Sequence, residues 1–475
     1  MRKLIIVALV LLGISSHAQD SLLINLNDVL ELARKNHPII KQAGLQDQFA
    51  EAEIRTAKGT LDPKITSTYN LKDYKDTEYW NKFYSALKIP VWFPIDPKIE
   101  AARSSGEYLN REDYIAPGED YWQVSAGVSV PIGKGLFIDE RRALIKQAKL
   151  YSDIAEAEKI KLSNKMLFTI VKSYWEWYFA YEQFVLMEQS MQIADEIFRR
   201  VKLDYEYGEA AVVDTVQAKI TYQNRRADYI NAGVQLNNSR LAMSIHLWSE
   251  EGLPLELPEN MTPSPESSLW IIPEDSTLDK VVIWAFENHP EIQKVSAKQG
   301  QYEIEQQWNR ESLKPQIDLS YSFIDAPFST SGLEPIDLGE NYKLGVDFSF
   351  PILLRKERGK LQKSKLQIES LGYELLQTQQ QIGAQIKSVH AELTASQQLT
   401  SQYADLAANY QRLLDAEIFN IENGESDLFK LNIQQDKFIE SQIKYLKVLI
   451  TYQKLKAELP YVAGLPYLSY LNMYE

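Results

Sequence analysis

Four short stretches of the chain alternate between apolar and polar residues. They lie at about 64–71, 122–130, 316–323 and 342–350. Alternation with a period of two places apolar side chains on one face of a β-sheet and polar side chains on the other. Each stretch has 8 or 9 residues, close to the roughly 9–11 that a tilted strand needs to cross a bilayer. The pattern therefore predicts four strands. Their polar face includes Lys64, Gln123, Asp318 and Asp347.

Two very long helices are predicted from the segments that follow these strands. Residues 139–205 contain neither proline nor glycine, and residues 357–423 contain no proline. At a rise of 1.5 Å per residue, about 67 residues make a rod of roughly 100 Å, and such a length suggests coiled-coil packing. The second rod carries a heptad seam, with alternating steps of four and three. The seam consists of Ile382, Ile386, Val389, Leu393, Ser396, Thr400, Tyr403, Ala407, Tyr410 and Leu414.

Each rod is expected to end at a glycine and turn back. Gly208 and Gly424 follow the two rods, as glycine commonly does just past a helix C-terminus. Returning helices are expected at about 213–247 and 428–458. The predicted helical hairpins therefore span 136–247 and 355–459.

The chain consists of two related repeats. Asn36-His37-Pro38 recurs as Asn288-His289-Pro290, and Tyr207-Gly208-Glu209 matches Asn423-Gly424-Glu425. In both repeats the proline can begin a helix, where its missing N–H is not needed, so His37, Pro38, His289 and Pro290 are interpreted as helix junctions. The first repeat is assigned to 19–247, the second to 276–459 and a tail to 460–475. The linker between the repeats, 248–275, contains five prolines, which break helices.

The first strand hairpin is much longer than the second. It is expected at about 63–131, and the second at about 315–351. The difference comes from a long inserted loop predicted at 72–121, which exceeds the usual length of a hairpin connection. Two interpretations of this insert are open: it folds as an extracellular cap, or it extends the strands.

The N-terminus and the composition limit the class of protein. Residues 1–18 contain a basic pair, a short apolar run and the small-residue site Ser16-His17-Ala18, which together predict a cleaved signal peptide. The chain has no cysteine, which excludes disulfides and thiolate metal sites. Its formal net charge of -14 disfavours a nucleic-acid partner. No later segment approaches the roughly 18 apolar residues of a membrane-spanning helix, so an exported chain of this kind is soluble, peripheral or a β-barrel.

Four strands from one chain cannot close a barrel. An open sheet edge in hydrocarbon would leave backbone N–H and C=O groups unpaired, at several kcal/mol each. Two chains would supply eight strands and three would supply twelve, and the polar inner set favours the larger, water-filled barrel. The alternative fold is a soluble β-sandwich, which shows the same alternation. A sandwich predicts regularly spaced short strands, whereas here two hairpins stand between very long helices.

These features together resemble the TolC-like outer membrane efflux family. The resemblance rests on the doubled order of Asn-His-Pro openings, Leu-x-Pro approaches to a strand and Gly-Glu turns, and it covers about 26–459. It implies a fold of α plus membrane β: a homotrimer with a twelve-stranded outer-membrane β-barrel, continued by a long periplasmic α-helical barrel. It also implies contact with outer-membrane lipid, a periplasmic adaptor protein and an inner-membrane pump.

The resemblance further implies an aperture at the helix turns, lined by acidic residues six and nine positions after the turn glycine. In the first repeat these positions hold Asp214 and Gln217. In the second repeat Lys430 occupies the first of them, and Asp427 lies nearby. We hypothesise that Lys430 pairs with Asp214 and helps to hold the tip closed. The alternative is that all four are ordinary solvated turn residues.

The residues offer no chemistry for an enzyme and no cofactor site. Four histidines remain after cleavage, none of them in a metal-ligand spacing, and no Ser–His–Asp arrangement is found. The favoured function is a passive outer-membrane channel subunit of a tripartite efflux or type I secretion system. The alternative is a soluble periplasmic coiled-coil scaffold or adaptor, although adaptors usually have one helical hairpin rather than two. The sequence does not name the cargo.

Overall fold

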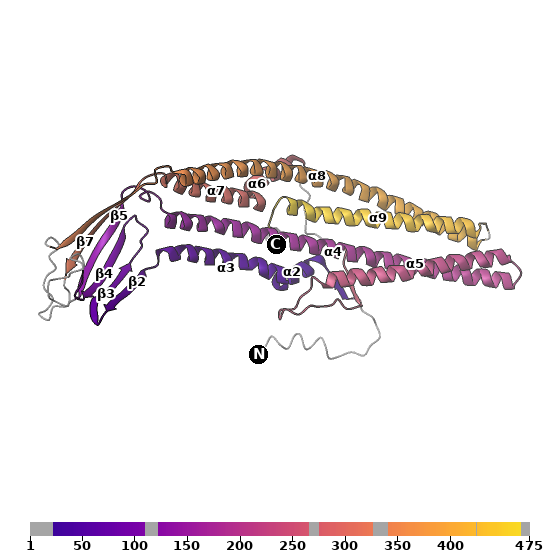
Figure 1. Ribbon diagram of the computed structural model, residues 1–475. Coiled ribbons are helices and arrows are strands. Elements are labelled where there is room, and N and C mark those ends of the chain that lie inside the picture. Colours follow the sequence, from indigo (N-terminus) through magenta and orange to yellow (C-terminus); the bar gives the residue numbers. More distant parts are fainter. Residues whose placement is uncertain (1–21, 110–121, 266–274, 326–340, 424, 467–475) are drawn as a thin grey trace, which may run out of the picture. The chain divides into compact units, whose positions relative to one another are not determined.

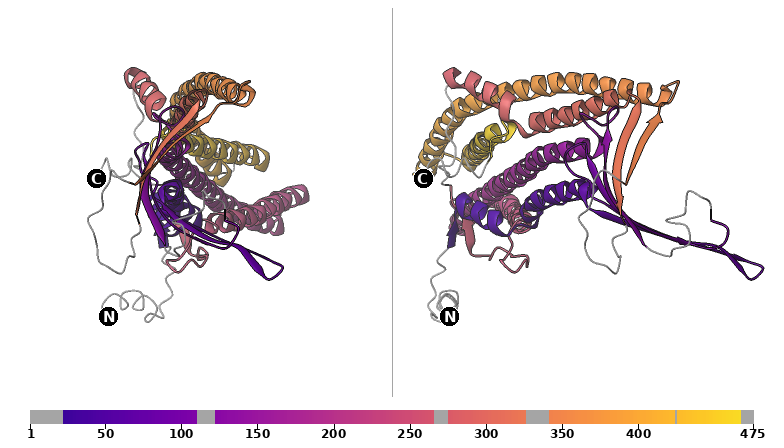
Figure 2. Two further views of the ribbon diagram at one scale, coloured as in Figure 1. Left: turned by 60° about the vertical axis from the view of Figure 1, so that its left-hand side comes forward. Right: turned by 90° about the vertical axis from the view of Figure 1, so that its left-hand side faces the viewer.

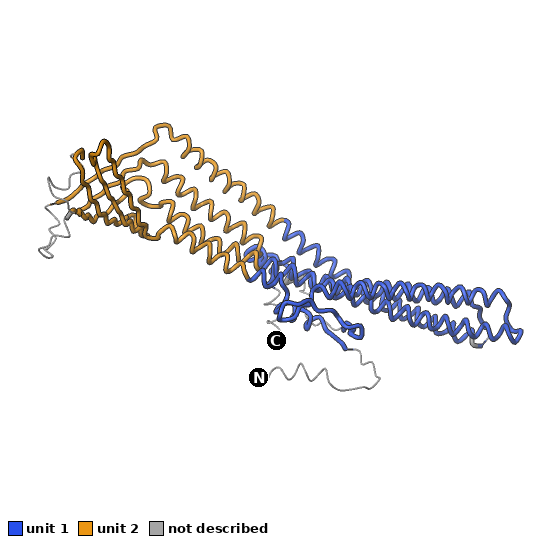
Figure 3. The backbone as a smooth tube through the Cα atoms, turned by 60° about the horizontal axis from the view of Figure 1, so that its bottom comes forward, with its two compact units in different colours: residues 1–44, 160–289, 381–475 blue, residues 45–159, 290–380 orange. Residues whose placement is uncertain are grey.

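The computed structural model describes five stretches of the chain: 22–109, 122–265, 275–325, 341–423 and 425–466. The predicted signal peptide and most of the predicted tail lie outside these residues. The chain divides into two compact units (Figure 3). The first comprises residues 1–44, 160–289 and 381–475, and the second comprises 45–159 and 290–380. Each unit therefore combines equivalent parts of both repeats.

The helices follow the predicted repeats (Figure 1). The first repeat contains α2 (Leu26–Asn36), α3 (Pro38–Lys58), α4 (Glu140–Glu206) and α5 (Val212–Ser244). The second contains α6 (Asp275–Asn288), α7 (Pro290–Glu311), α8 (Arg355–Glu422) and α9 (Leu428–Val462). The 67 residues of α4 and the 68 of α8 confirm the two predicted long helices. Among the described helices, none is long and apolar enough to cross a bilayer.

The heptad seam of α8 is confirmed as a packing surface. Ile386, Leu393 and Leu414 are at most 1% exposed. The smaller seam residues Ser396 and Ala407 are also buried. On the first helical hairpin, Phe198 of α4 stacks on Tyr222 of α5 with ring centroids 6.1 Å apart. The long helices are thus held by side-chain packing, as their length alone would require.

The junction between α2 and α3 forms where the proline predicts it. His37 has an extended backbone, with ψ 127°, because a residue that precedes proline is disfavoured in the helical conformation. The chain then restarts as α3 at Pro38. The start of α2 is fixed by Asn25, whose side chain accepts a hydrogen bond from the Asp28 backbone N–H at 2.9 Å, satisfying one of the unpaired donors of the first turn.

Six strands form one antiparallel sheet in the second unit, in the order β2-β3-β4-β5-β7-β8 (Figures 1 and 2). They are β2 (Lys64–Tyr74), β3 (Thr77–Lys88), β4 (Asp96–Ser105), β5 (Gln123–Pro131), β7 (Gln316–Asp325) and β8 (Tyr342–Ser349). The four predicted strands correspond to β2, β5, β7 and β8. The expected count of four strands per chain is corrected to six, because the segment predicted as an inserted loop at 72–121 contains β3 and β4.

The two additional strands lack the alternation that identified the others. In β3, aromatic residues occupy both faces, with Phe83 on one and Tyr84 on the other. In β4, Pro97 and the pair Ala101-Ala102 remove the contrast between faces. Lys75 and Asp76 join β2 to β3 with φ angles of 55° and 57°, the left-handed conformation of a two-residue hairpin turn. Neither residue is a glycine, so the usual sequence signal for such a turn is absent.

The first unit is centred on a core in which α2 packs against the middle of α4. Trp175 and Trp177 are each 1% exposed, and Tyr174 is fully buried. A short parallel pair, β1 (Leu22–Ile24) and β6 (Met261–Pro263), lies beside this core. The Tyr174 hydroxyl lies 3.0 Å from the Ile24 carbonyl oxygen and 2.7 Å from that of Ser264. One buried phenol therefore ties the N-terminal strand to the described part of the linker.

Candidate functional site

One face of the six-stranded sheet carries an apolar row that crosses every strand. Residues opposite each other in neighbouring strands share a face. One such row runs Ile65, Leu87, Ile99, Ala126, Phe323 and Tyr342. On β8, Leu344, Val346 and Phe348 continue this face and are 60%, 64% and 68% exposed. A contiguous exposed apolar surface of this kind is typical of a membrane or protein contact.

The opposite face is polar, and it carries all four residues predicted for a lumen. Lys64 lies opposite Lys88, which lies opposite Lys98. Gln123 lies opposite Ala102, and Asp318 lies opposite Asp347. The register therefore places Lys64, Gln123, Asp318 and Asp347 on one side of the sheet. Their position in a lumen stays a prediction, since it requires the sheet to close.

A charged cluster on this polar face was missed by the sequence reasoning. The Glu100 carboxylate forms an ion pair with Lys98 and accepts a hydrogen bond from the Tyr84 hydroxyl. The Ser125 hydroxyl donates to the same carboxylate at 3.1 Å. Because Glu100 and Lys98 lie in the segment expected to be a loop, only recognition of β3 and β4 as strands could have brought these groups together.

The base of the sheet is tied to the start of α4. Arg141 contacts Asp96 at 2.8 Å and Asp139 at 2.9 Å, and Lys88 lies 3.1 Å from Asp96. All of these side chains except that of Lys88 are less than a quarter exposed. The ends of β3 and β4 are therefore fixed to the helix that continues from the sheet.

Both edges of the sheet are open within the described residues. β2 pairs only with β3, and β8 pairs only with β7. Since the six strands alternate in direction, β2 and β8 run antiparallel to each other. Unpaired edge N–H and C=O groups are a template for another chain.

The tip residues predicted to form an aperture have local roles. Gly208 follows α4 in the left-handed conformation, with φ 81°, and Asp214 accepts a hydrogen bond from the Ala211 N–H at 3.1 Å. Asp427 caps α9 by accepting from the Lys430 N–H at 2.9 Å, and the Lys430 ammonium lies 3.9 Å from the same carboxylate.

The remaining tip predictions concern Gln217 and the turn glycine Gly424. Gln217 lies half-buried on α5, and Gly424 is outside the described residues. The contact between Lys430 and Asp427 is an intrachain ion pair, whereas pairing of Lys430 with Asp214 stays a prediction for an assembled tip.

A groove lined by both apolar and charged residues lies between α4, the end of α8 and the start of α9, close to these turns. Its lining includes Ile193, Ile197, Ile418, Ile421 and Leu428. Arg200, Asp204 and Glu209 add charge at its side. The sequence reasoning did not identify this groove, because its residues come from three helices that are far apart in the chain.

The first repeat junction buries two neighbouring histidines. His37 is 5% exposed, and its ring lies 6.1 Å from that of His246. The His37 Nδ1 accepts a hydrogen bond from the Ile39 N–H at 3.2 Å, and His246 Nε2 lies 3.1 Å from the Ser173 hydroxyl. Burial, and secondarily the neighbouring His246, lowers the pKa of His37 to about 4. Burial also lowers the pKa of His246.

The second junction has the same backbone form. The His289 N–H donates to the Ala285 carbonyl at 2.9 Å, and Pro290 begins α7. The interpretation of both Asn-His-Pro motifs as helix junctions agrees with these observations. Within the described residues, no group of three or more histidines or acids could hold a metal ion.

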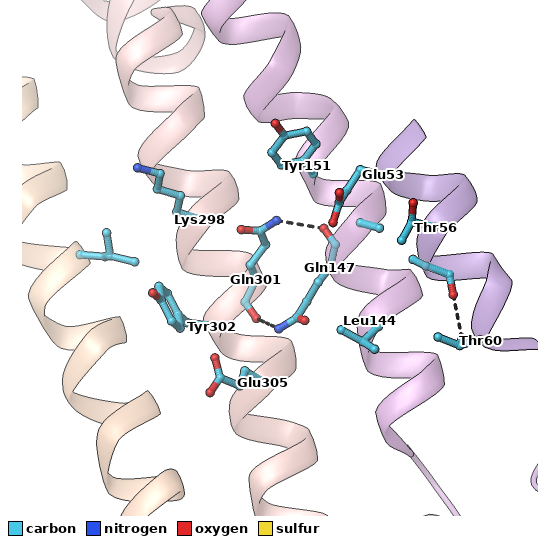
Figure 4. A pocket seen from close by; sticks show the side chains of 13 residues that line it. Glu53, Thr56, Thr60, Leu144, Gln147, Tyr151, Lys298, Gln301, Tyr302 and Glu305 are labelled. Carbon is cyan, nitrogen blue, oxygen red and sulfur yellow. Dashed lines mark hydrogen bonds between the residues drawn. The ribbon is translucent and has the colours of Figure 1, made fainter. Parts of the chain in front are cut away.

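A second hollow lies between α3, α4 and α7 in the other unit (Figure 4). The Gln147 side chain donates to the Gln301 carbonyl, and the Gln301 side chain donates to the Gln147 carbonyl, each at 3.0 Å. This reciprocal pair satisfies two amides between α4 and α7. The hollow is a space between packed helices, and its residues suggest no catalytic arrangement.

Comparison with known proteins identifies the same architecture. Residues 29–244 match the family model described as outer membrane efflux protein. The CmeC outer membrane channel of Campylobacter jejuni is 14% identical, with a TM-score of 0.63 over 92% of this chain and 85% of that one. The outer-membrane channel OprN is 12% identical, with a TM-score of 0.67 over 93% and 90%. The open-state MtrE channel of Neisseria gonorrhoeae is 14% identical, with a TM-score of 0.64 over 96% and 94%. No curated protein matches the chain.

A two-faced sheet joined to paired long helices is the fold that this chain shares with the outer-membrane channels named above. The match to the outer membrane efflux protein family model covers the first repeat, and the likeness to solved channel structures extends over both repeats. The alternative of a soluble scaffold or adaptor is not favoured, because the likeness to channels covers both repeats. The family and the similar structures are channels rather than enzymes.

We expect substitutions on the two faces of β7 to differ in effect. Tyr321→Arg places a charge on the apolar face and should destabilise the assembled protein by about 2–4 kcal/mol if it lies near the bilayer midplane. Ser322→Arg, on the adjacent polar face, should have a much smaller effect. The measurement is the denaturant midpoint of the folded protein in lipid. Equal losses for both variants would contradict the assignment of faces.

We also expect stability to fall in acid through the buried histidines. A folded-state pKa of about 4 for His37 lies below the ordinary value of 6.5. Between these two pH values the unfolded chain binds a proton at His37 that the folded chain does not bind. The contribution of neutral His37 to the free energy of unfolding is fully present above about pH 6.5 and declines as the pH falls towards 4. His37→Asn keeps an acceptor for the Ile39 N–H and should flatten this decline in melting temperature. An unchanged pH slope in the variant would rule out His37 as its source.

Proposed function

We propose that the protein is the passive exit duct of a tripartite efflux or type I secretion system. The observation that carries this proposal is a sheet with one apolar face, one polar face and two open edges, joined to long paired helices. Such a sheet is stable in a bilayer only when its edges are paired. The apolar face then meets outer-membrane lipid, and the polar face lines a water-filled lumen.

The proposed assembly is a homotrimer. Besides the open strand edges, the helices present exposed apolar residues that a single chain leaves uncovered. On α8, Leu399, Leu406 and Leu413 recur every seven residues and are 42%, 39% and 51% exposed. On α5, exposed apolar residues follow heptad-like steps. They are Val213, Val216, Ile220, Ile230, Val234 and Leu241. Seams of this kind fit coiled-coil contacts between protomers.

The partners proposed for the duct are a periplasmic adaptor protein and an inner-membrane pump. The groove beside the helix turns suits an adaptor, because it combines apolar residues with Arg200, Asp204 and Glu209. Transport energy would come from the pump. The aperture proposed for the assembled tip contains Asp214, Gln217, Asp427 and Lys430, with closure aided by a pair between Lys430 and Asp214.

Fractionation tests the duct directly. The protein should be recovered with the outer membrane, resist carbonate extraction and run as a trimer that dissociates on heating. The purified trimer should form discrete conductance steps in planar bilayers. Recovery as a detergent-free soluble protein would reject the duct and favour a scaffold.

A matched pair of variants on α4 tests the adaptor groove. Ile197→Glu places a charge among the groove residues and should weaken adaptor binding about tenfold or more, or roughly 1.4 kcal/mol. Leu203→Glu changes an exposed leucine of the same helix that is absent from the groove lining. Binding is measured by copurification of the adaptor with the channel from crosslinked membranes. If both variants bind equally, the groove is not the contact surface.

A further inference from the structure

We propose that β3 and β4 are part of the membrane wall, so that each protomer contributes six strands and a trimer closes an eighteen-stranded barrel. The inference rests on the proposed trimeric duct, but it concerns the construction of the wall rather than its function. The partner of the open β2 edge is then the β8 edge of a second copy of this chain. Because six is an even number, every contact around the barrel is antiparallel.

The first support is the continuity of the ladder. β2 pairs with β3 from Lys64 to Tyr74, β3 pairs with β4 from Asn81 to Lys88, and β4 pairs with β5 from Asp96 to Ala102. If the insert stood outside the wall, β2 and β5 would lose these partners. They would have to form a new ladder with each other to avoid unpaired backbone groups in hydrocarbon.

The second support is that one apolar row continues across the insert, although Arg103 lies farther along β4 on the same face. Leu87 and Ile99 lie in the apolar row between Ile65 and Ala126. On the other face, Lys98 and Glu100 form an ion pair. An extracellular cap would have no reason to continue the same faces in register.

The third support lies at the base of β3 and β4. The ion pairs of Asp96 with Arg141 and Lys88 tie this end to the start of α4. The connection at 89–95 exposes Trp92 by 41% and Phe93 by 68%. Aromatic residues beside strand ends are typical of the membrane–water interface. The connection is therefore placed at the periplasmic boundary of the bilayer, where the wall meets the helices.

The fourth support is the stagger of the strands. The base end of each strand is the end nearest the helices, which is Lys64 in β2 and Ser349 in β8. The apolar row begins at Ile65, one residue from the base end of β2, and reaches Tyr342, seven residues from the base end of β8. From β2 to β8 the row therefore shifts by six residues, which is about 20 Å along the strand direction. The five strand pairings that it crosses span about 24 Å perpendicular to the strands. If both base ends lie at one membrane level, the strands tilt by about 40°, within the 35–45° range of membrane barrels.

Adjacent alanines on β4 provide the test, because the chain has no cysteine of its own. Ala101→Cys lies on the apolar face and Ala102→Cys on the polar face. In β5, Ala126→Cys and Ser125→Cys are the matched pair, at the same distance from the strand base. Each purified trimer is labelled with a bimane maleimide and reconstituted into vesicles of brominated phosphatidylcholine, which quenches fluorophores that face the acyl chains.

The expected result is an equal loss of fluorescence for labels at 101 and 126, with little loss at 102 and 125. Quenching at 126 without quenching at 101 would overturn the eighteen-stranded wall and leave the duct intact. Quenching at neither position would reject the duct itself. The subunit count of the same sample, from native mass spectrometry, should be three; a dimer would close only twelve strands and would also overturn the proposal.

Discussion

Backbone pairing at the sheet edges is the constraint on which the rest of this molecule depends. A strand that borders hydrocarbon must have a partner on both sides, since no water replaces a missing N–H···O=C bond. Within the part of the chain that the structure describes, β2 and β8 each have one partner only. In the proposed duct, assembly is therefore part of folding, and neighbouring protomers cover the exposed seams of α5 and α8.

The sequence predicted most of the fold because its strongest signals are periodic. The long helices α4 and α8 occupy their expected places, and α3 and α7 begin at Pro38 and Pro290. The strands β2, β5, β7 and β8 were recognisable because apolar and polar residues alternate cleanly along them. β3 was not recognisable, because Phe83 and Tyr84 are both aromatic but lie on opposite faces. β4 was not recognisable, because Ala101 and Ala102 do not differ in polarity.

The candidate site was less predictable than the fold. Membership of the polar face could be read from alternation, so Lys64, Gln123, Asp318 and Asp347 fall on one side. The cluster around Glu100 could not be predicted from alternation, because a single sequence does not specify which strands become neighbours. Asp427 and Lys430 were assigned by resemblance, but within one chain they meet each other as a helix cap and its neighbour.

The insertion in only one repeat has a consequence for symmetry. Corresponding helices of the two repeats are nearly equal in length, with 67 and 68 residues in the longest pair. The helices of a trimer would therefore approach sixfold symmetry. The strands divide four to two between the repeats, so the sheet can have only threefold symmetry. Lysines 64, 88 and 98 fall in the larger share, whereas aspartates 318 and 347 fall in the smaller one. A molecule leaving the helical section would therefore pass from a nearly sixfold environment into a threefold one, in which a sector with paired lysines and acids alternates with a sector that carries the two aspartates.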